Sequence, residues 1–316
     1  MTGTYTSLEA ERDSQKLFLA MKGIGSDEQA LIDVLAHKSP EQSAALASTF
    51  KAHYGKELRH VIRQEVGLQS DFRDVLIALT MTQAGFDAYC LYHAMKGIGA
   101  DVEILLEILC ARTPPELKAI KDTYLARNQA SLEEAVKSEN IGPVKKLIVM
   151  ILQCQRDDTL YPKQEHILED VEALHKAGEK STGDESVFMS IFANRSYMHL
   201  RQMFEAYRER HKQVLREKIS ALFSGHIRSG LLNIYDYGLD RHSYFAVLLN
   251  ESMVGAGTRD KMLIRQVLRL RGSLKKPVKD AYVKLFRISL VKRIQDEGSV
   301  RGWYRAAILA LVDDAG

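Results

Sequence analysis

A glycine-rich segment that recurs along the chain is the feature that most constrains the fold. Residues 21–27 read Met-Lys-Gly-Ile-Gly-Ser-Asp, and residues 95–101 repeat them with Ala in place of Ser. A looser copy occupies residues 253–260. Similarity at a regular interval is the signature of a chain built from repeated structural modules. The segment therefore predicts a modular protein.

Aromatic residues extend this period to the whole chain. Four aromatic positions are separated by 74, 83 and 75 residues, and each is followed eight residues later by leucine. The aromatic residues are Phe50, Tyr124, Tyr207 and Tyr282, and the leucines are Leu58, Leu132, Leu215 and Leu290. Two series of markers thus predict four repeats. The longer middle step indicates a polar connector that divides the repeats into two consecutive pairs.

The predicted boundaries follow from these markers. We expect a short, loosely ordered tail, two repeats, a linker and two further repeats. These segments are 1–13 for the tail, 14–85 and 86–157 for the first two repeats, 158–172 for the linker, and 173–244 and 245–316 for the last two repeats.

The pattern within a repeat is helical. Apolar residues between Ala30 and Leu35 recur at the spacing of one helix face. Segments 39–42 and 113–116 each combine a Ser or Thr with a Gln or Glu three residues later, the capping-box pattern of a helix start. Segment 26–29 has the same pattern, so the glycine segment is expected to lead into a helix. The predicted fold class is all-α.

Each of three repeats also ends in an apolar run. The runs are 75–79, 147–152 and 306–311. They are shorter than the roughly 20 apolar residues that a membrane-spanning helix needs. We therefore expect them to form core helices.

Composition and motifs exclude several functions. The formal net charge of +3 is too small to indicate nucleic-acid binding. The sequence has neither a P-loop spacing nor a zinc-protease His pair, and no nucleophile with a matching base. We expect a non-enzymatic protein without a small-molecule substrate. The first residues lack an apolar signal segment, which predicts a cytoplasmic location.

The chain resembles the annexins. The resemblance depends on the M-K-G-x-G-[ST]-D loop, on four units of this size and on the long connector after the second unit. It implies four bundles of about five helices, arranged as a slightly curved disc with the loops on the convex face. It also implies calcium-dependent, reversible and peripheral binding to acidic phospholipid membranes, such as surfaces that contain phosphatidylserine.

The resemblance implies a ligand set for Ca²⁺ in each glycine loop. In annexins the carbonyls of the Met and of both Gly bind the ion, and a carboxylate about 44 residues after the Met completes the site. The corresponding residues here are Met21, Gly23, Gly25 and Glu65 in the first repeat, Met95, Gly97, Gly99 and Glu139 in the second, and Met253, Gly255, Gly257 and Glu297 in the fourth. Asp296 stands beside Glu297, so the acid of the fourth site stays open.

The third repeat departs from this pattern. Its loop begins at Gly178, and Leu222 stands where the carboxylate should fall. A strong calcium site is not expected there, although weak binding stays open.

Four loop residues are candidates for lipid contact. Lys22 and Lys96 would face the anionic surface. Ile24 and Ile98 would make shallow apolar contacts, with packing against their own repeats as the alternative.

The alternative function is a scaffold with the annexin fold. Such a protein would link a membrane to the cytoskeleton or to another protein partner, with little dependence on calcium. The presence of Glu65 and Glu139 at the ligand spacing favours calcium-dependent binding.

Overall fold

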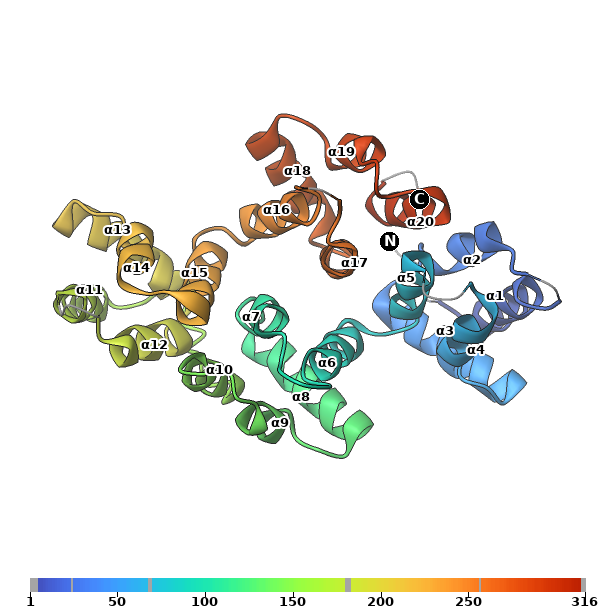
Figure 1. Ribbon diagram of the computed structural model, residues 1–316, viewed down its shortest axis with the longest axis horizontal. Coiled ribbons are helices and arrows are strands. Elements are labelled where there is room, and N and C mark those ends of the chain that lie inside the picture. Colours follow the sequence, from blue (N-terminus) through green and yellow to red (C-terminus); the bar gives the residue numbers. More distant parts are fainter. Residues whose placement is uncertain (1–4, 24, 68–69, 180–182, 256, 314–316) are drawn as a thin grey trace. The chain divides into compact units, whose positions relative to one another are not determined.

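The structure is a computed structural model that describes residues 5–23, 25–67, 70–179, 183–255 and 257–313 (Figure 1). Over these residues the chain forms 20 α-helices and no strand. The helices form two compact units, Met1–Phe86 with His242–Gly316, and Asp87–Arg241. Within the described ranges, no helix has the length and apolar character required to span a membrane.

The first unit joins the two ends of the chain. Helices α20 and α17 both pack against α5, and α20 also contacts α2, so the first and fourth repeats share one core. The helices are α1 (Ser7–Ala20), α2 (Glu28–Leu35), α3 (Pro40–Tyr54), α4 (Leu58–Glu65), α5 (Asp71–Leu79), α16 (Arg241–Ser252, of which Arg241 belongs to the other unit), α17 (Asp260–Arg269), α18 (Lys275–Phe286), α19 (Leu290–Asp296) and α20 (Gly302–Val312).

The second unit contains the middle of the chain. Helix α15 packs on α7 and α10, and α12 packs on α10, so the second and third repeats share a core. Helices α15 and α10 approach closely at Gly230 of α15, where an added Cβ would lie only 2.8 Å from Leu147 Cδ2 of α10. The helices are α6 (Gln83–Ala94, which starts in the first unit), α7 (Val102–Leu109), α8 (Pro114–Asn128), α9 (Leu132–Ser138), α10 (Val144–Leu152), α11 (Gln164–Gly178), α12 (Glu185–Asn194), α13 (Tyr197–His211), α14 (Leu215–Leu222) and α15 (Gly225–Leu239).

This division differs from the expected pairing of consecutive repeats. The connector at 158–172 lies inside the second unit, and α11 already begins within it at Gln164. The reason is that apolar faces of α7, α10, α12 and α15 pack together. Periodicity counts repeats, but it does not identify which repeats pack against each other.

The expected loose tail is largely helical. Helix α1 begins at Ser7, where Thr6 and Glu9 form a capping box. Ala10 is buried, and the Tyr5 hydroxyl donates to Asp13 Oδ2 at 3.0 Å. Helix α1 also packs against α2 and α3, so the start of the chain is attached to its first repeat.

The predicted capping boxes are confirmed at two of three sites. Ser39 with Gln42 and Thr113 with Glu116 cap α3 and α8. The box predicted at Ser26 is wrong, because Asp27 is the N-cap of α2 and its carboxylate accepts from Ala30 N at 3.0 Å. Asp101 caps α7 in the same way. The predicted apolar core helices are also confirmed as α5, α10 and α20, each with buried side chains.

Ion pairs of buried aspartates recur in the first three repeats. In each, an aspartate in the first helix contacts a basic residue 25 positions later. The pairs are Asp13–Lys38 at 2.7 Å, Asp87–Arg112 at 2.8 Å and Asp170–Arg195 at 2.6 Å. In the fourth repeat Arg271 instead donates to Lys38 O and Ser43 Oγ, both at 2.7 Å, and so links the fourth repeat to the first.

Candidate calcium sites

Three glycine loops join the first and second helices of their repeats. They follow α1, α6 and α16 and precede α2, α7 and α17. Each loop is closed by one backbone hydrogen bond of 2.8 Å that returns to the preceding helix. The bonds are Asp27 N to Ala20 O, Asp101 N to Ala94 O, and Arg259 N to Ser252 O. The common closure shows that the three loops are built alike.

The glycines adopt backbone conformations that other residues avoid. In the second loop φ is 118° at Gly97 and 81° at Gly99, and a Cβ on either would meet no atom within 4 Å. The backbone conformation, rather than lack of space, therefore requires glycine here. The equivalent glycines also have positive φ, at 116° for Gly23, 86° for Gly25, 112° for Gly255 and 103° for Gly257.

The three candidate carboxylates lie at equivalent helix ends. Glu65 is the last residue of α4, whereas Glu139 and Glu297 directly follow α9 and α19. Glu65 is exposed and Glu139 is partly exposed. Within the described part of the chain, neither of these two carboxylates has a hydrogen bond or an ion pair.

The fourth site shows directly that loop and carboxylate converge. Arg293 Nη2 donates to Met253 O, and Arg293 Nη1 donates to Glu297 Oε2 at 2.9 Å. One cationic side chain thus contacts two candidate ligands that are 44 positions apart in the sequence. The neighbouring Asp296 instead pairs with Lys292 at 2.7 Å on the exposed side of the helix. The geometry favours Glu297 over Asp296 as the acid that faces the loop.

The third repeat has an apolar contact at the equivalent position. A Cβ built on Gly178 would lie 3.3 Å from Leu222 Cδ1, and one on Gly183 would lie 2.9 Å from the Phe223 ring. Residue 222 follows Gly178 by the same 44 positions. The spacing therefore again brings a helix end to the start of the loop, but the side chain there has no oxygen. Residues 180–182 of this loop lie outside the described residues.

Two candidate lipid contacts can be placed in the second loop. Lys96 is exposed, with Nζ 5.8 Å from the Tyr92 ring centroid. Ile98 has a relative exposure of 108%, so it does not pack against its own repeat. In the first loop Lys22 is exposed, whereas Ile24 lies outside the described residues. In the fourth loop Val254 replaces the lysine and is 60% exposed.

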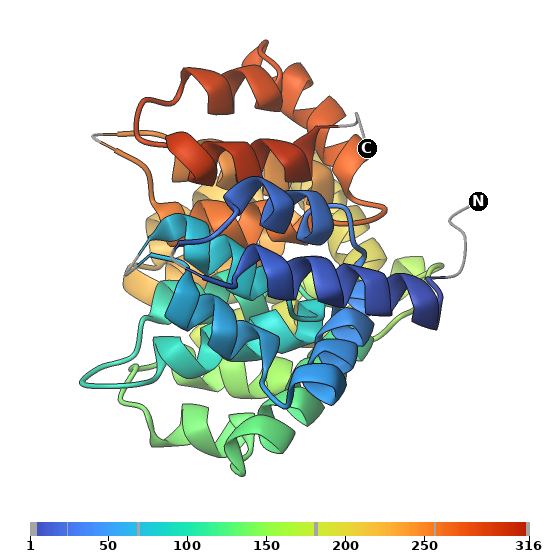
Figure 2. The same cartoon turned by 90° about the vertical axis from the view of Figure 1, so that its right-hand side faces the viewer.

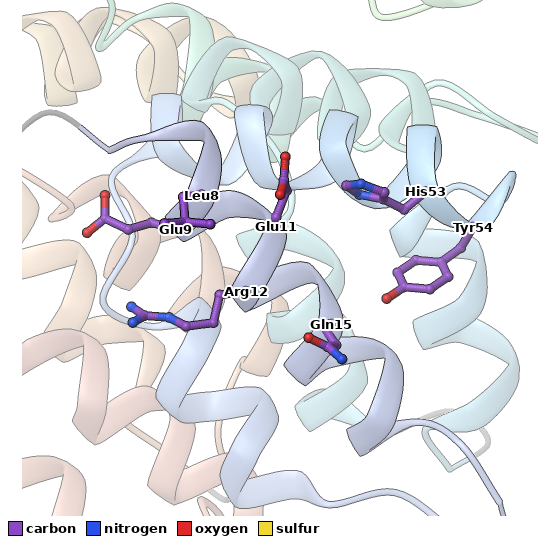
Figure 3. A pocket seen from close by; sticks show the side chains of 7 residues that line it. All are labelled: Leu8, Glu9, Glu11, Arg12, Gln15, His53 and Tyr54. Carbon is purple, nitrogen blue, oxygen red and sulfur yellow. The ribbon is translucent and has the colours of Figure 1, made fainter.

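A surface hollow of about 610 Å³ lies away from the loops (Figure 3). Figure 3 shows side chains of α1 on one side and two aromatic side chains from the end of α3 on the other. The lining residues are Leu8, Glu9, Glu11, Arg12, Gln15, His53 and Tyr54. None of the candidate site residues lines this hollow.

Side-chain ligands alone do not define a metal centre here. Over the described residues, no group of three or more His, Cys, Asp or Glu side chains could hold a metal ion.

Comparison with known proteins identifies the family. The annexin family model matches residues 12–79, 86–151 and 169–234. The chain belongs to the annexin family.

Individual relatives support this assignment. The chain is 35% identical to annexin A8 of Mus musculus over 302 residues, which cover 95% of this chain and 91% of that protein. It is also 35% identical to annexin A7 of Homo sapiens over 307 residues, which cover 97% of this chain. It spans 62% of the length of annexin A7.

Solved structures show the same fold. The K16A mutant of annexin A8 matches with a TM-score of 0.91 and 33% identity, covering 99% of this chain and 97% of that chain. Calcium-bound annexin (Sm)1 matches with a TM-score of 0.82 and 27% identity, covering 96% and 90%.

The comparisons confirm the resemblance and the predicted fold of four repeats of five helices. Annexins are non-enzymatic membrane-binding proteins that typically bind phospholipid in a calcium-dependent manner. Arg293 is not among the site residues that the sequence motifs predict. The signal available was a basic residue four positions before the fourth acid, where the first two repeats have Val61 and Ala135.

Proposed function

We propose that this annexin binds acidic phospholipid surfaces in a calcium-dependent manner through the glycine loops of its first, second and fourth repeats. The observation that carries the proposal is the convergence of Met253 O and Glu297 Oε2 on one guanidinium. It supports a cation position between a loop carbonyl and the carboxylate 44 residues later. The equivalent loops and helix ends of the first and second repeats extend the proposal to Glu65 and Glu139.

The residues of each loop fit an incomplete calcium site. Three carbonyls and a bidentate carboxylate would supply five oxygens, whereas calcium takes about six to eight. A bound calcium ion would provide positive charge and open coordination positions for a lipid phosphate. Because each loop contributes one carboxylate, the protein neutralises only part of that charge. The loops should therefore bind calcium weakly in solution and more tightly at an anionic surface.

Other loop residues would strengthen membrane contact. Lys22 and Lys96 would each contribute about 1 kcal/mol near an anionic surface. Ile98 would place an apolar side chain at the interface. In the first unit, Figure 2 shows the loops after α1 and α16 on the same side, opposite the start of α1. Two loops facing one surface would combine weak individual contacts.

The third repeat would not take part in calcium binding, because Leu222 occupies the position of the acid. We further propose that the protein is cytoplasmic and associates reversibly with the membrane surface as a peripheral protein. A protein partner on the opposite side of the bound chain would be compatible with it.

The test is co-sedimentation with vesicles that contain phosphatidylserine and with purely zwitterionic vesicles, each over a calcium titration and with a chelator. We expect chelator-reversible binding to the acidic vesicles alone. Replacing both acids, Glu65→Gln with Glu139→Gln, should raise the calcium midpoint at least several-fold while the circular dichroism spectrum stays helical.

A matched control removes two carboxylates elsewhere. Glu165 and Glu209 are exposed residues of α11 and α13. Glu165→Gln with Glu209→Gln should leave the calcium midpoint close to that of the wild type. An unchanged midpoint in the Glu65/Glu139 variant would contradict the ligand assignment. Calcium-independent binding would favour the scaffold function instead.

A further inference from the structure

At the fourth loop, an arginine side chain of the protein itself contacts the candidate calcium ligands. Arg293 Nη2 donates to Met253 O, and Nη1 donates to Glu297 Oε2 at 2.9 Å. The other carboxylate oxygen, Glu297 Oε1, accepts from Ser299 N at 3.3 Å. Both oxygens of the candidate ligand are thus engaged by groups of the chain itself.

The contact is partly shielded from water. The side chains of Arg293 and Glu297 are 23% and 13% exposed, whereas those of the adjacent pair Lys292 and Asp296 are 59% and 47% exposed. Shielding reduces screening by water and salt, so the Arg293–Glu297 contact should be the stronger of the two.

Among the described residues of the three loops with a candidate acid, the fourth site alone has this arrangement. The residue four positions before the acid is Val61 in the first repeat and Ala135 in the second. Neither side chain carries charge or a hydrogen-bond donor. The first two carboxylates therefore have no equivalent competitor from that position.

We propose that Arg293 sets the calcium affinity of the fourth repeat by occupying the ligands of the site with its own guanidinium. This inference rests on the proposed function of the loops. The guanidinium must leave Met253 O and Glu297 Oε2 before these oxygens can bind a metal ion. The fourth loop should therefore load at higher calcium than the first two and should respond to the largest calcium rises.

Other contacts hold the turn after α19 without Arg293. Arg305 Nη2 donates to Glu297 O at 3.0 Å, and Arg305 Nε donates to Val300 O at 2.6 Å. Arg301 Nε also donates to Gly298 O. Removal of the Arg293 side chain should leave this turn in place, so that the effect on calcium reports competition rather than unfolding.

The experiment isolates the fourth site in the full-length chain. In the Glu65→Gln/Glu139→Gln background, calcium binding without lipid is measured by calorimetry and by the fluorescence of Trp303, the single tryptophan of the sequence. Trp303 lies in the first turn of α20 and is 45% exposed. We expect Arg293→Ala to lower the half-saturating calcium concentration about tenfold, the scale of a lost charge-assisted hydrogen bond.

Two variants distinguish direct competition between Arg293 and calcium from a general effect of positive charge near the site. Lys292→Ala removes the same charge one residue away and should change the calcium requirement less than about twofold. Arg293→Lys keeps the charge but lacks the planar fork that bridges two oxygens, so its affinity should lie between those of the parent and Arg293→Ala. Circular dichroism without calcium confirms that each variant is folded.

The outcomes are separable from those of the proposed function. Equal or weaker calcium binding by Arg293→Ala, including no binding at millimolar calcium, would overturn the role of Arg293. An equal gain from Lys292→Ala would also overturn it, because bulk charge would then be the cause. The proposed function is judged on wild-type vesicle binding, and therefore either proposal can fail while the other holds.

Discussion

Replacement of Asp87 by Asn should destabilise this annexin strongly. Asp87 lies in α6, and Arg112 follows α7, so their ion pair joins the two helices that frame the second glycine loop. Arg112 Nε and Nη2 donate to the two carboxylate oxygens at 2.8 and 3.0 Å. The side chains are only 6% and 4% exposed. Asn retains the size of Asp but removes the charge that balances the buried guanidinium.

The expected loss of unfolding free energy follows from the burial of the ion pair. Burial alone lowers the pKa of Arg112, but the attraction and hydrogen bonds of Asp87 more than offset this effect and raise it overall. Without Asp87 the guanidinium keeps its charge, because the ordinary pKa of arginine lies far above neutral pH. Leaving one member of a buried ion pair without its partner costs about 3–5 kcal/mol of unfolding free energy.

The same unit contains a control with matched distances. Arg216 Nε and Nη2 donate to Asp236 at 2.8 and 3.0 Å, but these side chains are 48% and 32% exposed. An exposed pair contributes about 0–1 kcal/mol. Asp236→Asn should therefore have a small effect, although the hydrogen-bond distances of the two pairs are the same.

The assay is urea unfolding followed by far-ultraviolet circular dichroism at neutral pH. We expect a much lower urea midpoint for Asp87→Asn than for Asp236→Asn, with similar slopes. Asp87→Asn should also raise the calcium requirement of vesicle binding, because the helices around the second loop are less firmly held. Equal loss of stability in the two variants would refute the reasoning, since burial is the property that separates the pairs.

Two further predictions concern the second glycine loop and the loss of folding stability at low pH. Gly97→Ala places an L-residue at a φ of 118°, a backbone strain of about 1–3 kcal/mol. The variant should need more calcium for vesicle binding. An unchanged calcium requirement would show that the loop does not need this conformation. Burial alone would raise the pKa of Asp170, but hydrogen bonds and charges from His199 and Arg195 lower it below its usual value. Its stabilisation is therefore complete above about pH 4 and is lost as pH falls through the lowered pKa. Asp170→Asn should flatten the fall in melting temperature at acid pH, and an unaltered pH profile would contradict this assignment.

Much of the candidate site could be predicted because its pattern is local or periodic. The glycine loops depend on backbone conformations that few other residues tolerate, so the sequence displays them as short motifs. The carboxylates recur at one interval after the loops because the chain between loop and acid has the same total length, although single helices differ, with 15 residues in α3 and 12 in α18. The resulting assignments of Glu65, Glu139 and Glu297 remain predictions.

Other features could not be read in this way because they depend on single contacts. The cap of α2 is Asp27 rather than Ser26, a choice between neighbouring residues that both make good caps. In the sequence, Arg293 is one of several charged residues of a short helix. The role proposed for it follows from the contact of its side chain with a carbonyl 40 residues earlier in the chain.

The sequence by itself determined the number of repeats, their helical nature and the positions of the loops. These properties arise from interactions within one repeat, where periodicity, caps and glycine conformations act over a few residues. Only the tertiary structure decided that the first repeat shares a core with the fourth and the second with the third. Apolar helix faces in similar repeats carry similar patterns, so the choice of partner depends on the three-dimensional fit of side chains such as Leu147 beside Gly230.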